Sequence, residues 1–105
     1  MGEPQGLHLS NYVLAETYTL LGRRIGCAQA ARDLDLIRAS RLHVVHWVQE
    51  DLHREALELF RQAERRGPSF TDCTSFALMR RLGLTTAFTF DRDFADAGFQ
   101  MVPRA

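Results

Sequence analysis

Short apolar runs alternate with longer segments of helical periodicity along this chain of 105 residues, and the alternation limits the folds that it can adopt. The apolar runs are rich in β-branched and aromatic residues, as strands are, and they lie at 6–10, 42–48, 86–90 and 99–102. The helical segments lie between them, at 11–25, 27–40, 49–66 and 69–82. This order predicts an α/β fold with a mostly parallel sheet and flanking helices.

The composition fits one small domain and excludes several chemistries. A length of 105 residues matches a single domain, 1–105, and 46% apolar residues are enough for a core. No apolar run approaches the ~20 residues of a membrane span, so we expect a cytoplasmic protein without a membrane partner. All thirteen basic residues are arginine, which excludes a phosphate-loop or Schiff-base lysine. The net charge of zero argues against non-specific binding of nucleic acid through bulk charge.

Two aspartates, Asp91 and Asp93, directly follow the apolar run 86–90. Ligands of parallel sheets usually lie at the carboxyl ends of the strands, and carboxylates that meet there suit a hard cation such as Mg²⁺. Their position therefore favours a metal site. A D-x-D spacing is nevertheless a weak motif, and the same two acids could cap the turn before Gly98.

Asp72 and Glu16 each have a structural and a functional interpretation. Ser69 and Asp72 have the spacing of a capping box, in which the acid closes the first turn of a helix. Glu16 lies in the first helical segment, beside its apolar stripe. It is either a partly exposed side chain or a buried carboxylate that requires a partner. Periodicity does not decide between the two.

Four blocks of sequence resemble the PIN-domain family in wording and in order. They are NYVLAETYTLLGRR, SFTDCTSFALMRRLG, TAFTFDRDF and AGFQMV. The resemblance runs from about Leu7 to Val102, and its most specific part combines FTDCTSFALM with FTFDRDF. The chain looks most like the VapC type, the toxin half of bacterial toxin–antitoxin pairs. This resemblance implies a PIN-like fold.

The resemblance also implies a site and a reaction. In the family, clustered acids at the strand ends hold Mg²⁺ or Mn²⁺ and cut RNA. Carried over to this chain, the catalytic and metal-binding acids are Glu16, Asp72 and Asp91, with Asp93 as an auxiliary metal ligand and Thr89 as a hydroxyl beside the site.

Partners follow from the same resemblance. It implies an RNA substrate, a cognate antitoxin and a homodimer. Arg92, and either Arg80 or Arg81, are candidates to bind RNA phosphates, because an arginine fork matches phosphate oxygens. Solvated helix and loop charges explain these arginines at least as well.

One departure from the family concerns the beginning of the chain. Family members open with a central strand that ends in an aspartate, whereas this chain starts where the second strand is expected. We therefore expect a PIN-like domain that is incomplete at its N-terminus, lacks one metal ligand and cleaves RNA poorly or not at all as written. The alternatives are a catalytically incomplete PIN fold that acts as a binding or dimerisation module, and an unrelated α/β domain whose acids are caps.

Overall fold

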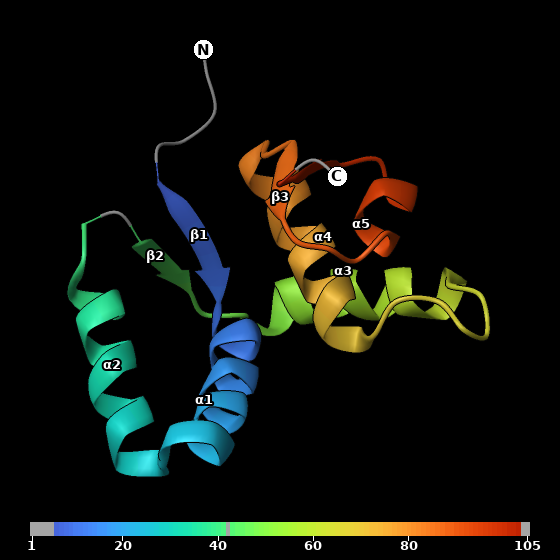
Figure 1. Ribbon diagram of the computed structural model, residues 1–105. Coiled ribbons are helices and arrows are strands. Elements are labelled where there is room, and N and C mark those ends of the chain that lie inside the picture. Colours follow the sequence, from blue (N-terminus) through green and yellow to red (C-terminus); the bar gives the residue numbers. More distant parts are fainter. Residues whose placement is uncertain (1–5, 42, 104–105) are drawn as a thin grey trace. The chain divides into compact units, whose positions relative to one another are not determined.

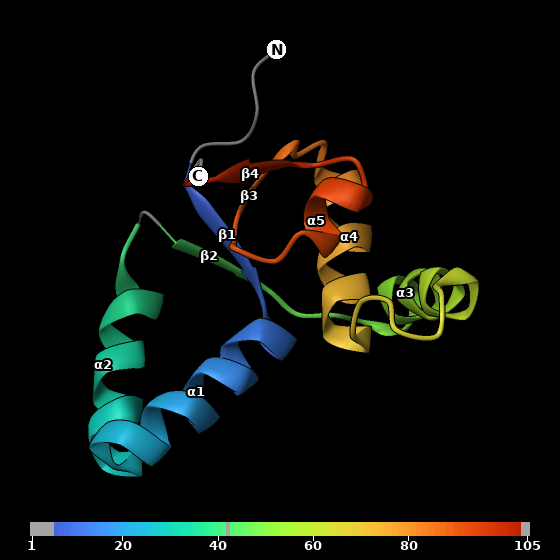
Figure 2. The ribbon, with the colours of Figure 1, turned by 45° about the vertical axis from the view of Figure 1, so that its right-hand side comes forward.

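The computed structural model describes residues 6–41 and 43–103 and divides the chain into two compact units. One unit comprises Gln5–Val48, and the other is built chiefly from Gln49–Ala105. Each unit contains two helices of at least thirteen residues and one pair of parallel strands. Figures 1 and 2 show the helices and strands of each unit.

The unit Gln5–Val48 contains one strand pair and one helix pair. Its elements are β1 (Leu7–Ser10), α1 (Asn11–Ile25), α2 (Cys27–Ala39) and β2 (His43–His46). Strands β1 and β2 pair in parallel, with Leu7 opposite His43. Helices α1 and α2 lie side by side in both views (Figures 1 and 2). Their facing sides form the core of this unit, with Leu14, Ala30 and Leu34 almost fully buried.

Local signals set the ends of helix α1. The amide of Val13 donates a hydrogen bond of 3.1 Å to Ser10 Oγ, so Ser10 is the expected N-cap. Gly26 ends the helix at φ 90°, a conformation that side-chain-bearing residues rarely adopt. The helix therefore continues through Gly22 and ends before Gly26.

The unit Gln49–Ala105 contains three of the predicted site residues, Asp72, Asp91 and Asp93. Its elements are α3 (Glu50–Gln62), α4 (Phe70–Leu82), β3 (Thr86–Phe88), α5 (Asp93–Asp96) and β4 (Gln100–Val102). Helices α3 and α4 pack against each other, and the core between them includes Leu52, Ala56, Cys73 and Ala77. Strands β3 and β4 pair in parallel, with Thr86 opposite Gln100.

The prediction of an α/β fold with parallel strands is confirmed, because both described strand pairs are parallel and helices separate the strands. The third strand is shorter than the predicted run 86–90, because the chain leaves β3 after Phe88 to form a hydrogen-bonded loop. The first residue of the predicted run 42–48 lies outside the described residues. A single domain that is incomplete at its N-terminus stays a prediction.

Membrane insertion through a helix finds no support in the part of the chain that the structure describes. None of its helices combines the length and the apolar character that a membrane crossing requires.

Candidate metal centre

Asp72 lies in the first turn of helix α4, where it completes the capping box that the sequence predicts. Its amide donates to Ser69 Oγ at 3.0 Å, and its Oδ2 accepts a hydrogen bond of 3.1 Å from the Ser69 amide. Both bonds satisfy backbone amides at the start of the helix. The bond from the Ser69 amide to Asp72 Oδ2 also orients the Asp72 side chain.

The loop after β3 is ordered by two local hydrogen bonds. The amide of Asp91 donates to Thr89 Oγ1 at 3.0 Å, and the amide of Asp93 donates to Asp91 Oδ1 at 2.9 Å. Side-chain oxygens that accept from an amide two residues further on make tight turns of this kind. Thr89 is also tied to the sheet, because its amide donates to the Val102 carbonyl at 2.9 Å. The loop therefore carries Asp91 and Asp93 from the end of a strand in a fixed conformation.

An aromatic contact fastens this loop to helix α4. Phe94, next to Asp93, packs edge-on against Phe76 with ring centroids 4.8 Å apart. Phe99 stacks on the same ring at 5.8 Å, and Phe76 itself is 4% exposed. Asp72 and Phe76 lie four residues apart and so occupy neighbouring positions on one face of the helix. Packing of Phe94 on Phe76 therefore brings Asp93 towards Asp72.

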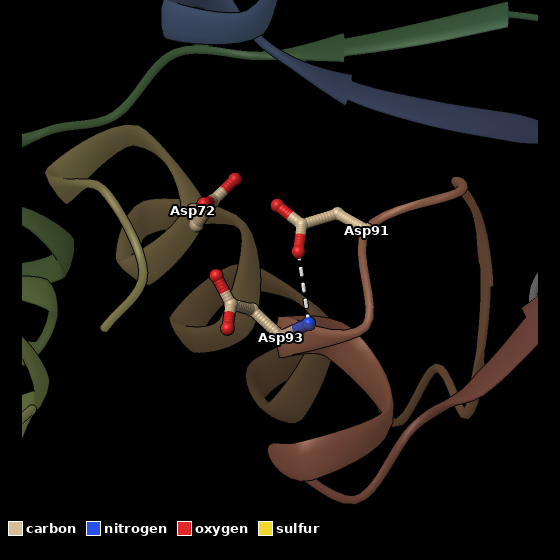
Figure 3. Close-up of side chains that lie close together, drawn as sticks. All are labelled: Asp72, Asp91 and Asp93. Atoms are coloured by element: carbon tan, nitrogen blue, oxygen red, sulfur yellow. Dashed lines mark hydrogen bonds between the residues drawn. The ribbon is translucent and has the colours of Figure 1, made fainter. Parts of the chain in front are cut away.

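These elements bring three of the predicted site residues together. One carboxylate oxygen from each of Asp72, Asp91 and Asp93 lies within 4.8 Å of the others. Figure 3 shows the three side chains pointing towards one another, with Asp72 on α4, Asp91 on the loop after β3 and Asp93 at the start of α5. Asp72 and Asp93 are half-buried and Asp91 is exposed, so the cluster opens to solvent.

The electrostatics of the cluster fit a cation. Desolvation, followed by the negative charges of Asp91, Asp72 and Asp96, raises the pKa of Asp93 above its ordinary value. Within residues 6–41 and 43–103, none of the three clustered acids has an arginine or histidine in an ion pair. Three carboxylate oxygens that converge without an ion-pair partner are a donor set for a hard divalent ion such as Mg²⁺ or Mn²⁺.

Glu16 lies in the other unit, on helix α1. Its side chain is exposed, and it lines a hollow of about 370 Å³ with Ala15, Thr19 and Leu20. Of the two interpretations of its sequence position, the exposed side chain is the one observed within the unit. The assignment of Glu16 as a metal ligand stays a prediction.

The three candidate arginines differ in their surroundings. Arg81 donates to Asp51 Oδ2 at 3.1 Å and to Glu55 Oε1 at 2.7 Å, so its guanidinium is already paired. Arg80 and Arg92 are exposed, and no side-chain hydrogen bond or ion pair involves them in the described residues. Of the adjacent pair on α4, Arg80 is the one available for a ligand.

A contact in the first unit had no signal in the sequence. His8 Nδ1 and His46 Nε2 are 2.8 Å apart, with the rings stacked at 5.1 Å, on the paired strands β1 and β2. Burial, followed by the charge of His8, lowers the pKa of His46. The strand register creates this pair from residues 38 positions apart, so no local motif could have predicted it.

Comparison with known proteins identifies the family. A family model described as the PIN domain matches residues 2–100, nearly the whole chain. The chain belongs to the PIN-domain family. Two curated relatives, both called 23S rRNA-specific endonuclease VapC20, come from two strains of Mycobacterium tuberculosis, CDC 1551/Oshkosh and ATCC 25618/H37Rv. Each is 44% identical over 97 residues, which cover 92% of this chain and 73% of the relative.

A solved structure supports the same assignment. The crystal structure of Mycobacterium tuberculosis VapC20, described as a sarcin–ricin loop cleaving toxin, has a TM-score of 0.80 and 44% identity. The match covers 92% of this chain and 74% of that protein. The predicted membership of the VapC-type PIN family, with its ribonuclease toxins, is therefore confirmed, and nucleases of this family depend on a metal ion.

Proposed function

We propose that this protein is a divalent-metal-dependent endoribonuclease of the VapC toxin type. The observation that carries the proposal is the convergence of Asp72, Asp91 and Asp93 on one small volume, where none of them forms an ion pair within the described residues. The ion is Mg²⁺ or Mn²⁺, because both prefer oxygen ligands. Family resemblance adds Glu16 as a further carboxylate of the centre.

The proposal assigns a role to each of the three clustered acids and to Thr89. Asp72 and Asp91 hold the metal ion from a helix start and from a loop, while Asp93 contributes from the edge. Thr89 positions Asp91 through its bond to the Asp91 amide. When bound, the ion would supply an activated water and would balance charge on the phosphate that is cut. The protein supplies rigid placement, on which metal-assisted hydrolysis depends.

The substrate class follows from the relatives. The two curated relatives are named as endonucleases specific for 23S rRNA, and the protein of the solved structure is a toxin that cleaves the sarcin–ricin loop. We propose a structured loop of ribosomal RNA as the target of this chain as well. Unpaired loop bases are accessible to a protein surface, unlike the edges of bases in the deep groove of an RNA duplex.

Two protein partners belong to the same proposal, a cognate antitoxin and a second copy of the chain in a homodimer, all in the cytoplasm. Support comes from apolar side chains that are exposed within the unit Gln5–Val48, among them Leu20 and Trp47, both at 60%, and Leu36 at 73%. Exposed apolar surface of this kind commonly marks a protein contact. Light scattering at micromolar concentration tests the homodimer, and a stable monomer overturns it.

Cleavage of a hairpin RNA that carries the sarcin–ricin loop tests the enzyme. We expect Mg²⁺-dependent cleavage by the unaltered protein and none with Asp72→Asn. Cleavage that survives Asp72→Asn or EDTA would indicate another chemistry. No cleavage by the unaltered protein would overturn the proposal and leave the binding or dimerisation module as the alternative.

A further inference from the structure

A cavity of about 480 Å³ opens beside the acidic cluster, within the unit Gln49–Ala105. It lies between the end of helix α3, the turn that follows it, helix α4 and helix α5. Asp93 belongs both to the cluster and to the wall of this cavity. Its volume is within the range of pockets that bind small molecules or single cofactor groups.

The wall of the cavity combines an apolar floor with two arginines. Leu59, Phe76 and Ala97 supply apolar surface, while Arg66 and Arg80 supply guanidinium groups. Neither arginine has an ion pair or a side-chain hydrogen bond elsewhere in the described part of the chain. Two unpaired arginines beside a hydrophobic floor match a phosphate joined to a base.

Helix α4 carries residues of both the acidic cluster and the cavity. Asp72, Phe76 and Arg80 follow one another at intervals of four residues, so they lie near one side of the helix. At ~1.5 Å per residue, Arg80 is about 12 Å along the axis from Asp72. Long side chains of a helix lean towards its N-terminus, which brings the guanidinium back over the turn of Phe76. One face of α4 thus carries a metal ligand, an apolar surface and a cation in succession.

A metal ion on the cluster would make the cavity more favourable for a phosphate. The charged residues of the cavity wall are Glu64, Asp93 and Asp96 against Arg66 and Arg80, and the cluster adds Asp72 and Asp91, which gives a net charge of −3. A divalent cation on the cluster changes this to −1, so the repulsion of a phosphate is smaller with the ion than without it.

We propose that this cavity is the subsite for the nucleotide next to the scissile phosphate of the RNA. The phosphate of that nucleotide binds Arg80 and Arg66, and its base lies against the side chains of Leu59 and Ala97, which are both half-buried. This assignment rests on the proposed ribonuclease function and adds to it the residues that position the substrate. Arg66 and Arg80 act here as positioning residues, since neither is among the three ligands of the cluster.

Binding of a fluorescent hairpin RNA that carries the sarcin–ricin loop tests the subsite. The RNA is recovered after each titration to verify that it is intact. We expect Arg80→Gln and Arg66→Gln each to weaken binding in Mg²⁺ by roughly tenfold. Each should also reduce the slope of log affinity against log salt by about 0.7, the value for one phosphate contact in a single strand.

The chain provides a matched control beside each arginine. Arg81 adjoins Arg80 but is paired with Asp51 and Glu55, and Arg65 adjoins Arg66 but does not line the cavity. Arg81→Gln and Arg65→Gln should bind RNA within twofold of the unaltered protein and keep its salt slope. Equal losses in all four variants would show a diffuse basic surface and overturn the subsite, as would no loss in Arg80→Gln.

Two further measurements separate the subsite from the reaction. Titration with Mn²⁺ should give the same metal affinity for Arg80→Gln as for the unaltered protein, while RNA cleavage by this variant shows a raised KM. If no cleavage occurs with any variant but Mg²⁺-dependent RNA binding still requires Arg80, the ribonuclease function fails and the nucleotide pocket stands. If cleavage proceeds with an unchanged KM in Arg80→Gln, the pocket assignment fails and the nuclease stands.

Discussion

Two substitutions separate the structural role of Asp72 from its role as a metal ligand. In the capping box, Ser69 Oγ accepts from the Asp72 amide at 3.0 Å, and Asp72 Oδ2 accepts from the Ser69 amide at 3.1 Å. Ser69→Ala removes the first bond and leaves the carboxylate in place. Asp72→Asn keeps an acceptor oxygen for the second bond and removes the charge that a cation requires.

The two variants should differ in stability without metal. Loss of an N-cap side chain costs about 1 kcal/mol, which lowers Tm by about 4–8 °C in a protein of this size. Asp72→Asn loses about 0.3–1 kcal/mol of interaction with the helix dipole. It also relieves repulsion from Asp91 and Asp93, which lie within 4.8 Å through their nearest ligand oxygens. We therefore expect Ser69→Ala to be the less stable of the two without metal.

The order should reverse when metal is added. At a hundredfold excess over Kd, a bound ion stabilises the native protein by about 2.7 kcal/mol, on the order of 10–20 °C in Tm. Ser69→Ala keeps all three carboxylates and should show this full increment above its lower baseline. Asp72→Asn should show little or none.

Thermal unfolding followed by circular dichroism, with EDTA or with a series of MnCl₂ concentrations, measures both effects. Asp96→Asn serves as the control, because Asp96 is near the cluster but outside its three ligands. If Asp72→Asn destabilises the protein in EDTA as much as Ser69→Ala and still gains the full Mn²⁺ increment, Asp72 is only a cap. The proposed metal centre would then be wrong.

Three further perturbations test the surroundings of the site and the histidine pair. Thr89→Val removes the acceptor for the Asp91 amide, so Mn²⁺ affinity measured by calorimetry should fall by about 10-fold or more, as for other residues that orient a ligand. Phe94→Ala removes the ring that packs on Phe76, and chemical denaturation should show a loss of roughly 2 kcal/mol, since Phe94 is only half-buried. The pKa of His46 is lowered from 6.5, so the unfolded chain binds more protons below that value and stability should fall as the pH decreases from about 6.5 through the folded pKa. His46→Gln should flatten the dependence of Tm on pH in this range.

Each of these expectations has a result that contradicts it. Unchanged Mn²⁺ affinity in Thr89→Val would show that the loop holds its shape without the threonine hydroxyl. Phe94→Ala with unaltered stability would mean that the aromatic contact does not fasten the loop. A Tm of the unaltered protein that stays constant between about pH 7.5 and about pH 5 would contradict the lowered pKa of His46.

Local signals in the sequence predicted the strands and the four longer helices, but not the short helix α5. The grouping of Asp72, Asp91 and Asp93 came from the family resemblance. The capping box identified Ser69 as the N-cap of α4, since its two bonds join residues three positions apart. The short apolar runs located the strands to within two residues at each end. Strand β3 ends earlier than its apolar run, and the Asp91 amide beyond it donates to Thr89 Oγ1 in a local turn.

Contacts between residues that lie far apart along the chain could not be predicted from the sequence. The packing of Phe94 on Phe76, and the stacking of His8 on His46, depend on how the elements meet in three dimensions. The distinction between Arg80 and Arg81 has the same origin. Arg81 is engaged by acids of helix α3, some thirty residues earlier, and no periodicity in α4 reveals that.

The local bonding of the loop after β3 affects how such metal sites can change in evolution. Its two hydrogen bonds each span two residues, from Thr89 to Asp91 and from Asp91 to Asp93, and its anchor Phe94 is the next residue. The segment 89–94 therefore carries two carboxylates, the bonds that orient them and the ring that docks them. Such a hexapeptide can be exchanged as one piece between homologous proteins, provided that the recipient offers a phenylalanine at the position of Phe76. Recombination at this point would leave the oxygen ligands in register, and it would also preserve the neighbouring cavity, because Asp93 is the one residue of this segment among those that line it.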